Sequence, residues 1–300
     1  MSCVPYFKAT EIAKKTWMIE YDFTVNEHMY SYLLEGSECS LLIDTMMGWG
    51  DLKGFCETLT DKPIILVNTH AHPDHVGGNY AFDKCYLHPL DMNGLYHDKP
   101  WTSEVMMESA KKSSRPEFLD KIKESDFTPE KPMIALPVWE GDCFDLGDRK
   151  IDVVLAGGHT PGSIVLIDDE NRICFTGDCC NGYTLMNFRS SLSVEEYLHS
   201  LIDLKRHSYR FDTLYGGHCV LGTVVIDEGI VACAKVINGT DAKLPRPGMF
   251  GRTAIFAVPF VGDSYEIADG KCFNMCYNPE KILTPEKKGK TIGMKKEPIF

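Results

Sequence analysis

The chain has 300 residues, of which 44% are hydrophobic and 25% charged, so it can bury one large core or two small ones. Its formal net charge of −12 argues against binding nucleic acid through the phosphate backbone, because such binding needs a basic surface. No long apolar run follows the first charged residues, and no stretch approaches the roughly 18 apolar residues of a membrane span. We therefore expect a cytoplasmic protein that binds neither nucleic acid nor a membrane.

The first 91 residues alternate apolar segments with polar turns. Their periodicity predicts strands over 29–36, 39–48, 62–70 and 85–91, and helices over 51–59 and 73–82. The segment 62–70 is nearly continuous in apolar and β-branched residues, which is typical of a strand buried on both faces.

The segment 92–133 is charge-rich and contains four prolines, so it resembles an inserted helical lid. Helices are expected within it over 103–113 and 116–125. Further along the chain, strands are expected over 150–158, 162–178 (a hairpin) and 211–218, and helices over 193–208 and 227–239. Residues 250–300 are expected to form edge strands and a lysine-rich tail. The pattern favours a single α/β domain, 1–300, with two sheets face to face and helices outside.

Three of the ten histidines lie within six residues of the segment NTHAHPDHVGG, at the carboxyl end of the predicted strand 62–70. The carboxyl ends of strands are where α/β sheets generally place their sites. Imidazole and carboxylate groups are ligands for zinc, iron and manganese. The cluster of His70, His72, Asp74 and His75 therefore predicts a metal site rather than a polar loop.

Three later segments repeat one arrangement, in which an apolar strand runs into glycine and then into a metal-ligand residue type. They are His159 in LAGGHTPG, Asp178 in CFTGDCC and His218 in LYGGHCV. Glycine lets the backbone approach a crowded centre closely. Each of these motifs alone is most often an ordinary turn, so their interpretation depends on the order in which they follow HAHPDH.

In this order, THAHPDH, GGHTPGS, TGDCC and YGGH, together with the earlier LLIDT, resemble the five motifs of the metallo-β-lactamase superfamily, over about residues 30–237. The resemblance implies an αββα four-layer sandwich of two mixed sheets with metal ions at the sheet edges. The ligands it implies are His70, His72 and His159 for a first ion, Asp74, His75 and His218 for a second, and Asp178 as the bridge. Asp44 would support the ligand loop from behind. The aspartate at the bridging position is similar to the glyoxalase II and lactonase branches rather than to true zinc β-lactamases.

The expected cofactors are two divalent metal ions, zinc before iron or manganese. Two ions about 3.5–4 Å apart can share a hydroxide that is available at neutral pH. We therefore expect hydrolysis of a small ester, lactone or thioester by a metal-bridging hydroxide, with Asp74 as the catalytic proton carrier. A phosphodiesterase, a sulfatase or a mononuclear iron thiol dioxygenase remains an alternative, as does a non-catalytic metal-binding protein. The neighbouring thiols of Cys179 and Cys219 are not expected to be ligands.

The substrate is expected to be a small molecule held by residues that follow Asp178 in CCNGYTLMNFR. Tyr183, Met186 and Arg189 are the predicted contacts, with the Tyr183 hydroxyl as a donor to a developing oxyanion, and Phe188 is expected in a similar position. Trp101, in the insertion, is expected to add an apolar wall. These side chains suit an uncharged or amphipathic substrate, and the chain can form a homodimer.

Overall fold

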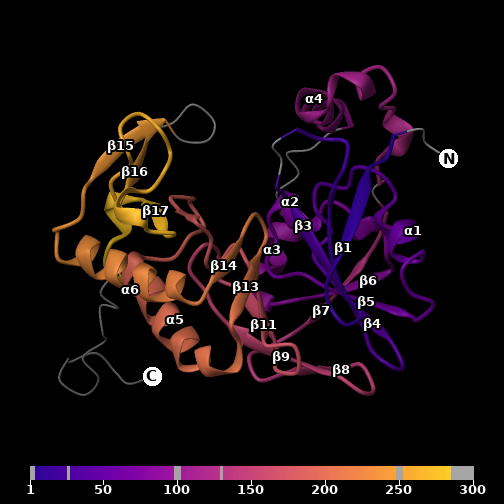
Figure 1. Cartoon of the computed structure of the whole chain (residues 1–300), viewed down its shortest axis with the longest axis horizontal. Coiled ribbons are helices and arrows are strands. Elements are labelled where there is room, and N and C mark those ends of the chain that lie inside the picture. Colours follow the sequence, from indigo (N-terminus) through magenta and orange to yellow (C-terminus); the bar gives the residue numbers. More distant parts are fainter. Residues whose placement is uncertain (1–3, 26–27, 98–102, 129–130, 248–252, 285–300) are drawn as a thin grey trace, which may run out of the picture.

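The computed structural model describes residues 4–25, 28–97, 103–128, 131–247 and 253–284 (Figure 1). Its first sheet has seven strands that are neighbours in chain order. These are β1 (Phe7–Ala13), β2 (Thr16–Tyr21), β3 (Tyr30–Glu35), β4 (Ser40–Ile43), β5 (Ile64–Val67), β6 (Lys84–Leu87) and β7 (Ile134–Pro137). The second sheet has six strands in the order β14-β13-β11-β10-β9-β8. These are β8 (Cys143–Asp145), β9 (Lys150–Leu155), β10 (Ile164–Asp168), β11 (Ile173–Gly177), β13 (Thr213–Gly216) and β14 (Val220–Gly222).

The two sheets pack face to face, and the helices cover their outer faces. In Figure 1, α5 (Val194–Arg206) and α6 (Val224–Ile237) lie on one side of the sheets, and α1 (Leu52–Cys56) lies on the other. Buried side chains of both sheets, such as Leu41 and Leu166, form one core between them. Two further cores lie between each sheet and its outer layer. This arrangement confirms the predicted four-layer sandwich.

Strand β5 shows how sequence pattern determines these layers. Its residues Leu66 and Val67 are both buried, but Leu66 belongs to the outer core and Val67 to the core between the sheets. Alternate residues of a strand point to opposite faces, so a strand between two cores must be apolar at nearly every position. The apolar run of this segment is therefore a strand buried on both faces, as predicted.

One of the predicted helices is much shorter than its segment, and another is wrong. The segment 73–82 forms only the single turn α2 (Pro73–Val76) and a 3₁₀ turn (Asn79–Ala81). Gly77 and Gly78 between them lie against the backbone of Thr45–Met47, where a longer helix with side chains would clash. The segment 116–125 forms 3₁₀ turns over Pro116–Phe118 and Glu124–Asp126. Short isolated helices are marginal in water, and this segment contributes Ile122 to the outer core of the first sheet without a regular helix.

The segment 92–133 contributes α3 (Met92–His97) and α4 (Ser103–Ser113), and Ala110 of α4 is buried in the outer core of the first sheet. Its role as a lid stays a prediction. Near the C-terminus, strands form a separate four-stranded sheet rather than extending either main sheet. Its order is β12 (Tyr183–Met186), β17 (Asn274–Tyr277), β16 (Thr253–Phe256) and β15 (Leu244–Pro247). None of the helices within the described residues combines the length and apolarity needed to cross a bilayer.

Candidate metal centre

The ends of four strands bring the predicted ligands together. His70 follows β5, His159 follows β9, Asp178 directly follows β11 and His218 follows β13. Strands β9 and β11 are each antiparallel to β10, and β11 is parallel to β13, so β9, β11 and β13 end at the same edge of the second sheet. The loop after β5, in the first sheet, meets them at this edge.

All seven predicted ligand residues lie in two compact groups. The first group contains His70, His72 and His159, and the second contains Asp74, His75, Asp178 and His218. Within each group, one ligand atom from every residue lies within 4.8 Å of the others. Residues up to 148 positions apart in the chain thus converge on one centre, in the grouping that the motifs imply.

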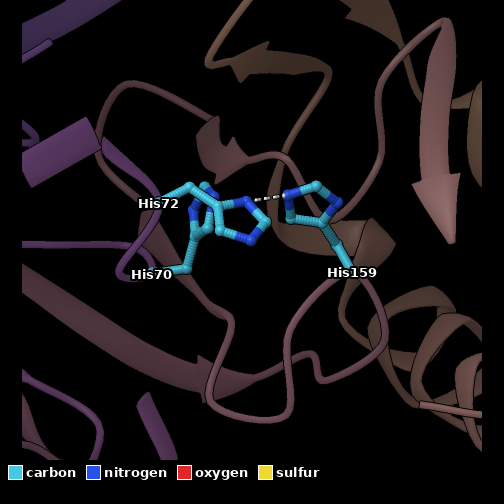
Figure 2. Close-up of side chains that lie close together, drawn as sticks. All are labelled: His70, His72 and His159. Carbon is cyan, nitrogen blue, oxygen red and sulfur yellow. Dashed lines mark hydrogen bonds between the residues drawn. The ribbon is translucent and has the colours of Figure 1, made fainter. Parts of the chain in front are cut away.

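The first group is a triangle of imidazole rings (Figure 2). The His72 Nδ1 and His159 Nε2 atoms face each other at 2.7 Å, and the His70 ring lies 4.8 Å from the His72 ring. Burial lowers the pKa of His70 well below its ordinary value and, with the neighbouring His159, brings the pKa of His72 to about 3. These rings are therefore neutral at physiological pH, which is the form that binds a metal ion.

The second group pairs imidazoles with carboxylates. The Nε2 atoms of His75 and His218 each lie 3.4 Å from Asp178 Oδ1, and His218 Nε2 lies 3.3 Å from Asp74 Oδ2. Burial opposes the charged form of His75, but the surrounding carboxylates outweigh it and raise the pKa of this ring to about 10. A divalent cation held among these groups would take the place of the proton that the carboxylates favour on the rings.

The Nδ1 atoms of three ligand histidines face acceptors outside the centre, so their Nε2 atoms face the centre. His75 Nδ1 lies 2.7 Å from Asp44 Oδ2, His159 Nδ1 lies 2.8 Å from the Leu185 carbonyl, and His218 Nδ1 lies 2.6 Å from the His28 carbonyl. An acceptor at Nδ1 fixes the tautomer whose Nε2 lone pair points to the centre. The Nε2 atoms of His70 and His75 are buried and have no hydrogen-bond partner among the described residues. The residues thus fit metal ions.

Asp44 lies behind the centre, as the sequence implied. Its carboxylate accepts hydrogen bonds from the Thr69 backbone N–H at 2.8 Å and the Thr69 hydroxyl at 2.7 Å, besides contacting His75. Its backbone has a φ of +60°, an uncommon conformation for a residue other than glycine. Asp44 thereby connects the end of β4 to the ligand loop that follows β5.

A search with family models matches residues 28–210 to the metallo-beta-lactamase superfamily, which is well over half of the chain. The chain belongs to the metallo-beta-lactamase superfamily. This superfamily member is a metal-dependent hydrolase, and its two His/Asp groups suit divalent ions.

Several proteins are similar to this superfamily member. The human acyl-coenzyme A thioesterase MBLAC2 is 27% identical over 235 residues, which cover 74% of this chain and 76% of that protein. The atrochrysone carboxyl ACP thioesterase AacuM of Aspergillus aculeatus is 24% identical and covers 81% of this chain and 68% of its own length. The crystal structure of the family protein TTHA1429 from Thermus thermophilus superimposes with a TM-score of 0.53 at 18% identity, over 78% of this chain and 85% of that one. This last similarity supports the fold alone.

The predicted substrate contacts lie in different environments. Tyr183 is partly exposed, and its hydroxyl donates to the Tyr265 carbonyl of the C-terminal sheet. Met186 is buried in the core beside α5, while Arg189 is exposed. Trp101 lies outside the described residues. Phe188, which the sequence also placed at the mouth of the site, lies beside the metal centre, with its ring centroid 4.9 Å from that of His72 and 5.5 Å from that of His159.

Sequence reasoning assigned no role to Asp91, which connects two ligand loops. Its buried carboxylate accepts hydrogen bonds from the Ala71 N–H at 3.2 Å, the Thr160 hydroxyl at 2.6 Å and the Gly162 N–H at 2.7 Å. Ala71 stands between His70 and His72, and Thr160 follows His159. The aspartate of the segment HPLD belongs to no recognisable motif. Its role is therefore visible only from the packing of the two loops.

The cysteines next to the ligands behave as ordinary thiols. Cys179 is fully buried, and burial raises the pKa of its thiol to about 12. Burial likewise raises the pKa of Cys219, whose sulfur donates to Asn181 Oδ1 at 3.5 Å. Since the thiolate is the form that binds metal ions, these pKa values favour the histidines and aspartates as the ligands.

Proposed function

We propose that the chain is a zinc-dependent thioesterase that hydrolyses small or carrier-linked acyl thioesters. The main support for this proposal is the position of the Asp178 carboxylate, which lies between the two groups of ligand residues. Its Oδ1 is 3.4 Å from the Nε2 atoms of His75 and His218, and its Oδ2 is 3.5 Å from His159 Nε2. One carboxylate that faces both groups supports a pair of ions rather than one, and a His-rich ligand set with carboxylates is typical of zinc.

When bound, such ions would supply Lewis acidity and lower the pKa of bound water to about 7. The first ion would be held by His70, His72 and His159, the second by Asp74, His75 and His218, and Asp178 would contact both. Asp74 is the proposed proton acceptor, because its carboxylate is partly exposed, with a side-chain accessibility of 30%. Burial would raise the pKa of Asp74, but His75 and His218 outweigh it and lower that pKa, so the carboxyl group is ionised at neutral pH.

The ionised state of Asp74 supports a thioester as the substrate. Asp74 is ionised, so it cannot donate a proton to a leaving group before it has accepted one. A thiolate leaves readily because its conjugate acid has a pKa of about 8.5, whereas an alkoxide needs a proton more strongly. Phe188 adds an apolar surface beside His72 and His159, which suits an acyl chain. The similarity to two thioesterases supports the same substrate class.

The test compares substrates that share one acyl group. The purified protein would be assayed on an acyl-coenzyme A, the matching oxygen ester, a lactone and an aryl phosphodiester, with metal content measured on the same sample. We expect about two zinc ions per chain, and kcat/KM at least about tenfold higher for the thioester, a difference of about 1.4 kcal/mol in the barrier. Preference for any other substrate would contradict the proposal, as would undiminished activity after chelation to less than about 0.1 ion per chain.

A further inference from the structure

Asn181 is a buried polar residue that the proposed reaction does not use. It stands three positions after Asp178 and is 5% exposed. Its side-chain amide donates a hydrogen bond to Asp178 Oδ1 at 2.8 Å, and its backbone N–H donates to the Thr184 hydroxyl at 3.1 Å. The second bond holds the backbone of Asn181 in place, so the amide group has a fixed position relative to the carboxylate.

The contact concerns a particular oxygen of Asp178. Oδ1 is the atom that faces His75 and His218 of the second group, whereas Oδ2 faces His159 of the first. A rotation of the carboxylate about its χ2 bond would exchange these two roles or aim both oxygens elsewhere. Because the amide donates only to Oδ1, it selects the orientation in which the carboxylate faces both groups.

The other end of the same amide contacts the His218 loop. Asn181 Oδ1 accepts a hydrogen bond from the Cys219 thiol at 3.5 Å, and Cys219 directly follows His218. A Cβ atom on Gly216 would lie 2.6 Å from Asn181 Oδ1, so the glycine makes room for this contact. One side chain therefore contacts Asp178 of the second group and the residue that follows His218, at the ends of two different strands, β11 and β13.

We propose that Asn181 is a positioning residue that orients the Asp178 carboxylate toward the second group and thereby sets the affinity for one of the two metal ions. This inference rests on the ligand assignment of the proposed function. Hydrogen-bond partners behind metal ligands typically change metal affinity about 10- to 100-fold when they are mutated. The effect falls on the second group, because the first group keeps His70, His72 and His159 without help from Asn181.

The chain offers a matched control in Asn171. Its amide donates to the carboxylate of Asp168, also three positions away and also at 2.8 Å, but at the opposite end of β11 from Asp178. Asn181→Ala and Asn171→Ala thus remove the same interaction near to and far from the metal centre. Zn²⁺ and Co²⁺ would be titrated into chelator-treated full-length protein against a chromophoric chelator, and the visible spectrum of bound Co²⁺ recorded at each equivalent.

We expect Asn181→Ala to lower the affinity for one equivalent of zinc about 10- to 100-fold and to leave the affinity for the other unchanged. The visible spectrum of the more weakly bound Co²⁺ should change as well. Asn171→Ala should bind both equivalents like the parent. If Asn181→Ala does not fold, Asn181→Leu, which has a similar volume but no donor, replaces it. Asp178→Ala separates the two hypotheses. If Asp178→Ala binds both equivalents of zinc like the parent, the ligand assignment is wrong. If Asp178→Ala loses zinc but Asn181→Ala binds both equivalents like the parent, the proposed role of Asn181 is wrong.

Discussion

At the scale of single residues, the metal centre depends on a few atoms that only certain side chains provide. The Asp74 carboxylate contacts His218 and is partly exposed, whereas the other carboxylate of its group, Asp178, is buried. The two aspartates therefore differ in access to solvent, and a proton can leave the centre through Asp74 more readily than through Asp178.

Asp74→Asn preserves the shape of the side chain and removes its basicity. We expect turnover to fall about 10²- to 10⁴-fold, the usual contribution of a general acid–base group. Asp83→Asn is the control, because Asp83 is a fully solvated surface residue paired with Lys131. Metal content must be measured on each sample, since lost metal would produce the same fall. Full metal content with near-native turnover would remove Asp74 from the mechanism.

Gly217, in the YGGH motif, is required by the crowding of the centre. A Cβ atom at this position would lie 2.4 Å from His75 Cε1 and 2.7 Å from Asp178 Oδ1. Gly217→Ala should therefore displace two ligands and weaken metal binding by at least about tenfold, a value typical of misplaced metal ligands. Chelator competition measures this effect.

Gly222→Ala is the matched control for that variant, because no described atom lies within 4 Å of a Cβ atom placed there. It should change neither metal affinity nor, beyond about 0.5 kcal/mol, stability. Equal metal affinities for the two alanine variants would contradict the close approach that we describe at Gly217.

At the scale of elements, the loops after β5 and β9 form one structural unit because Asp91 hydrogen-bonds to both. These loops carry all three histidines of the first group. The carboxylate of Asp91 accepts three hydrogen bonds in a buried environment, and hydrogen bonds to charged groups are worth about 1.5–3 kcal/mol each. The geometry of the first group therefore depends on a residue that touches none of its rings.

Asp91→Ala should lower the free energy of unfolding by on the order of 3 kcal/mol and weaken the first metal site, because three buried donors lose their acceptor. Urea unfolding and metal content would be measured in parallel. Asp145→Ala serves as the control, since Asp145 is exposed and accepts from the Gly147 N–H within a surface turn. Parent-like stability and metal content in Asp91→Ala would show that the loops hold their positions without this residue.

At the scale of the whole molecule, a buried arginine of the second sheet also contacts the first sheet. Arg149, before β9 in the second sheet, pairs with the buried Asp168 and also donates to the Thr16 hydroxyl of the first sheet at 2.8 Å. A charge that loses its partner in such a place is costly, because water cannot replace the partner.

Arg149→Ala should lower the free energy of unfolding by about 3–5 kcal/mol. Arg172→Ala removes an arginine whose pairing with Asp212 is exposed, and it should cost about 1 kcal/mol or less. Denaturant unfolding of the two variants tests this difference. Similar losses in both would mean that the buried contacts of Arg149 contribute no more than a surface ion pair.

The sequence by itself determined the layers and the ligand residue types. Alternation and continuous apolar runs report which strands are buried, because side-chain direction has a fixed period of two in any strand. The motif HAHPDH and the three glycine-preceded ligands likewise carry their chemistry in residue type and order. The family match confirms the superfamily, while the individual metal ligands and the thioester substrate remain proposals.

Only the tertiary structure decided how neighbouring segments support the centre. Several strands had no expected counterpart, because strands that are short or partly exposed lack a clear apolar pattern; these are β1, β2, β7, β8, β12, β14 and β15. Helix 73–82 was cut short because Gly77 and Gly78 pack against the backbone after Asp44. Asp91 was not identified because hydrogen bonds between distant loops depend on where both loops lie, which local sequence does not record. Asn181 lies only three positions after Asp178, but its contact with Cys219 and the orientation of its amide depend on the packed loops.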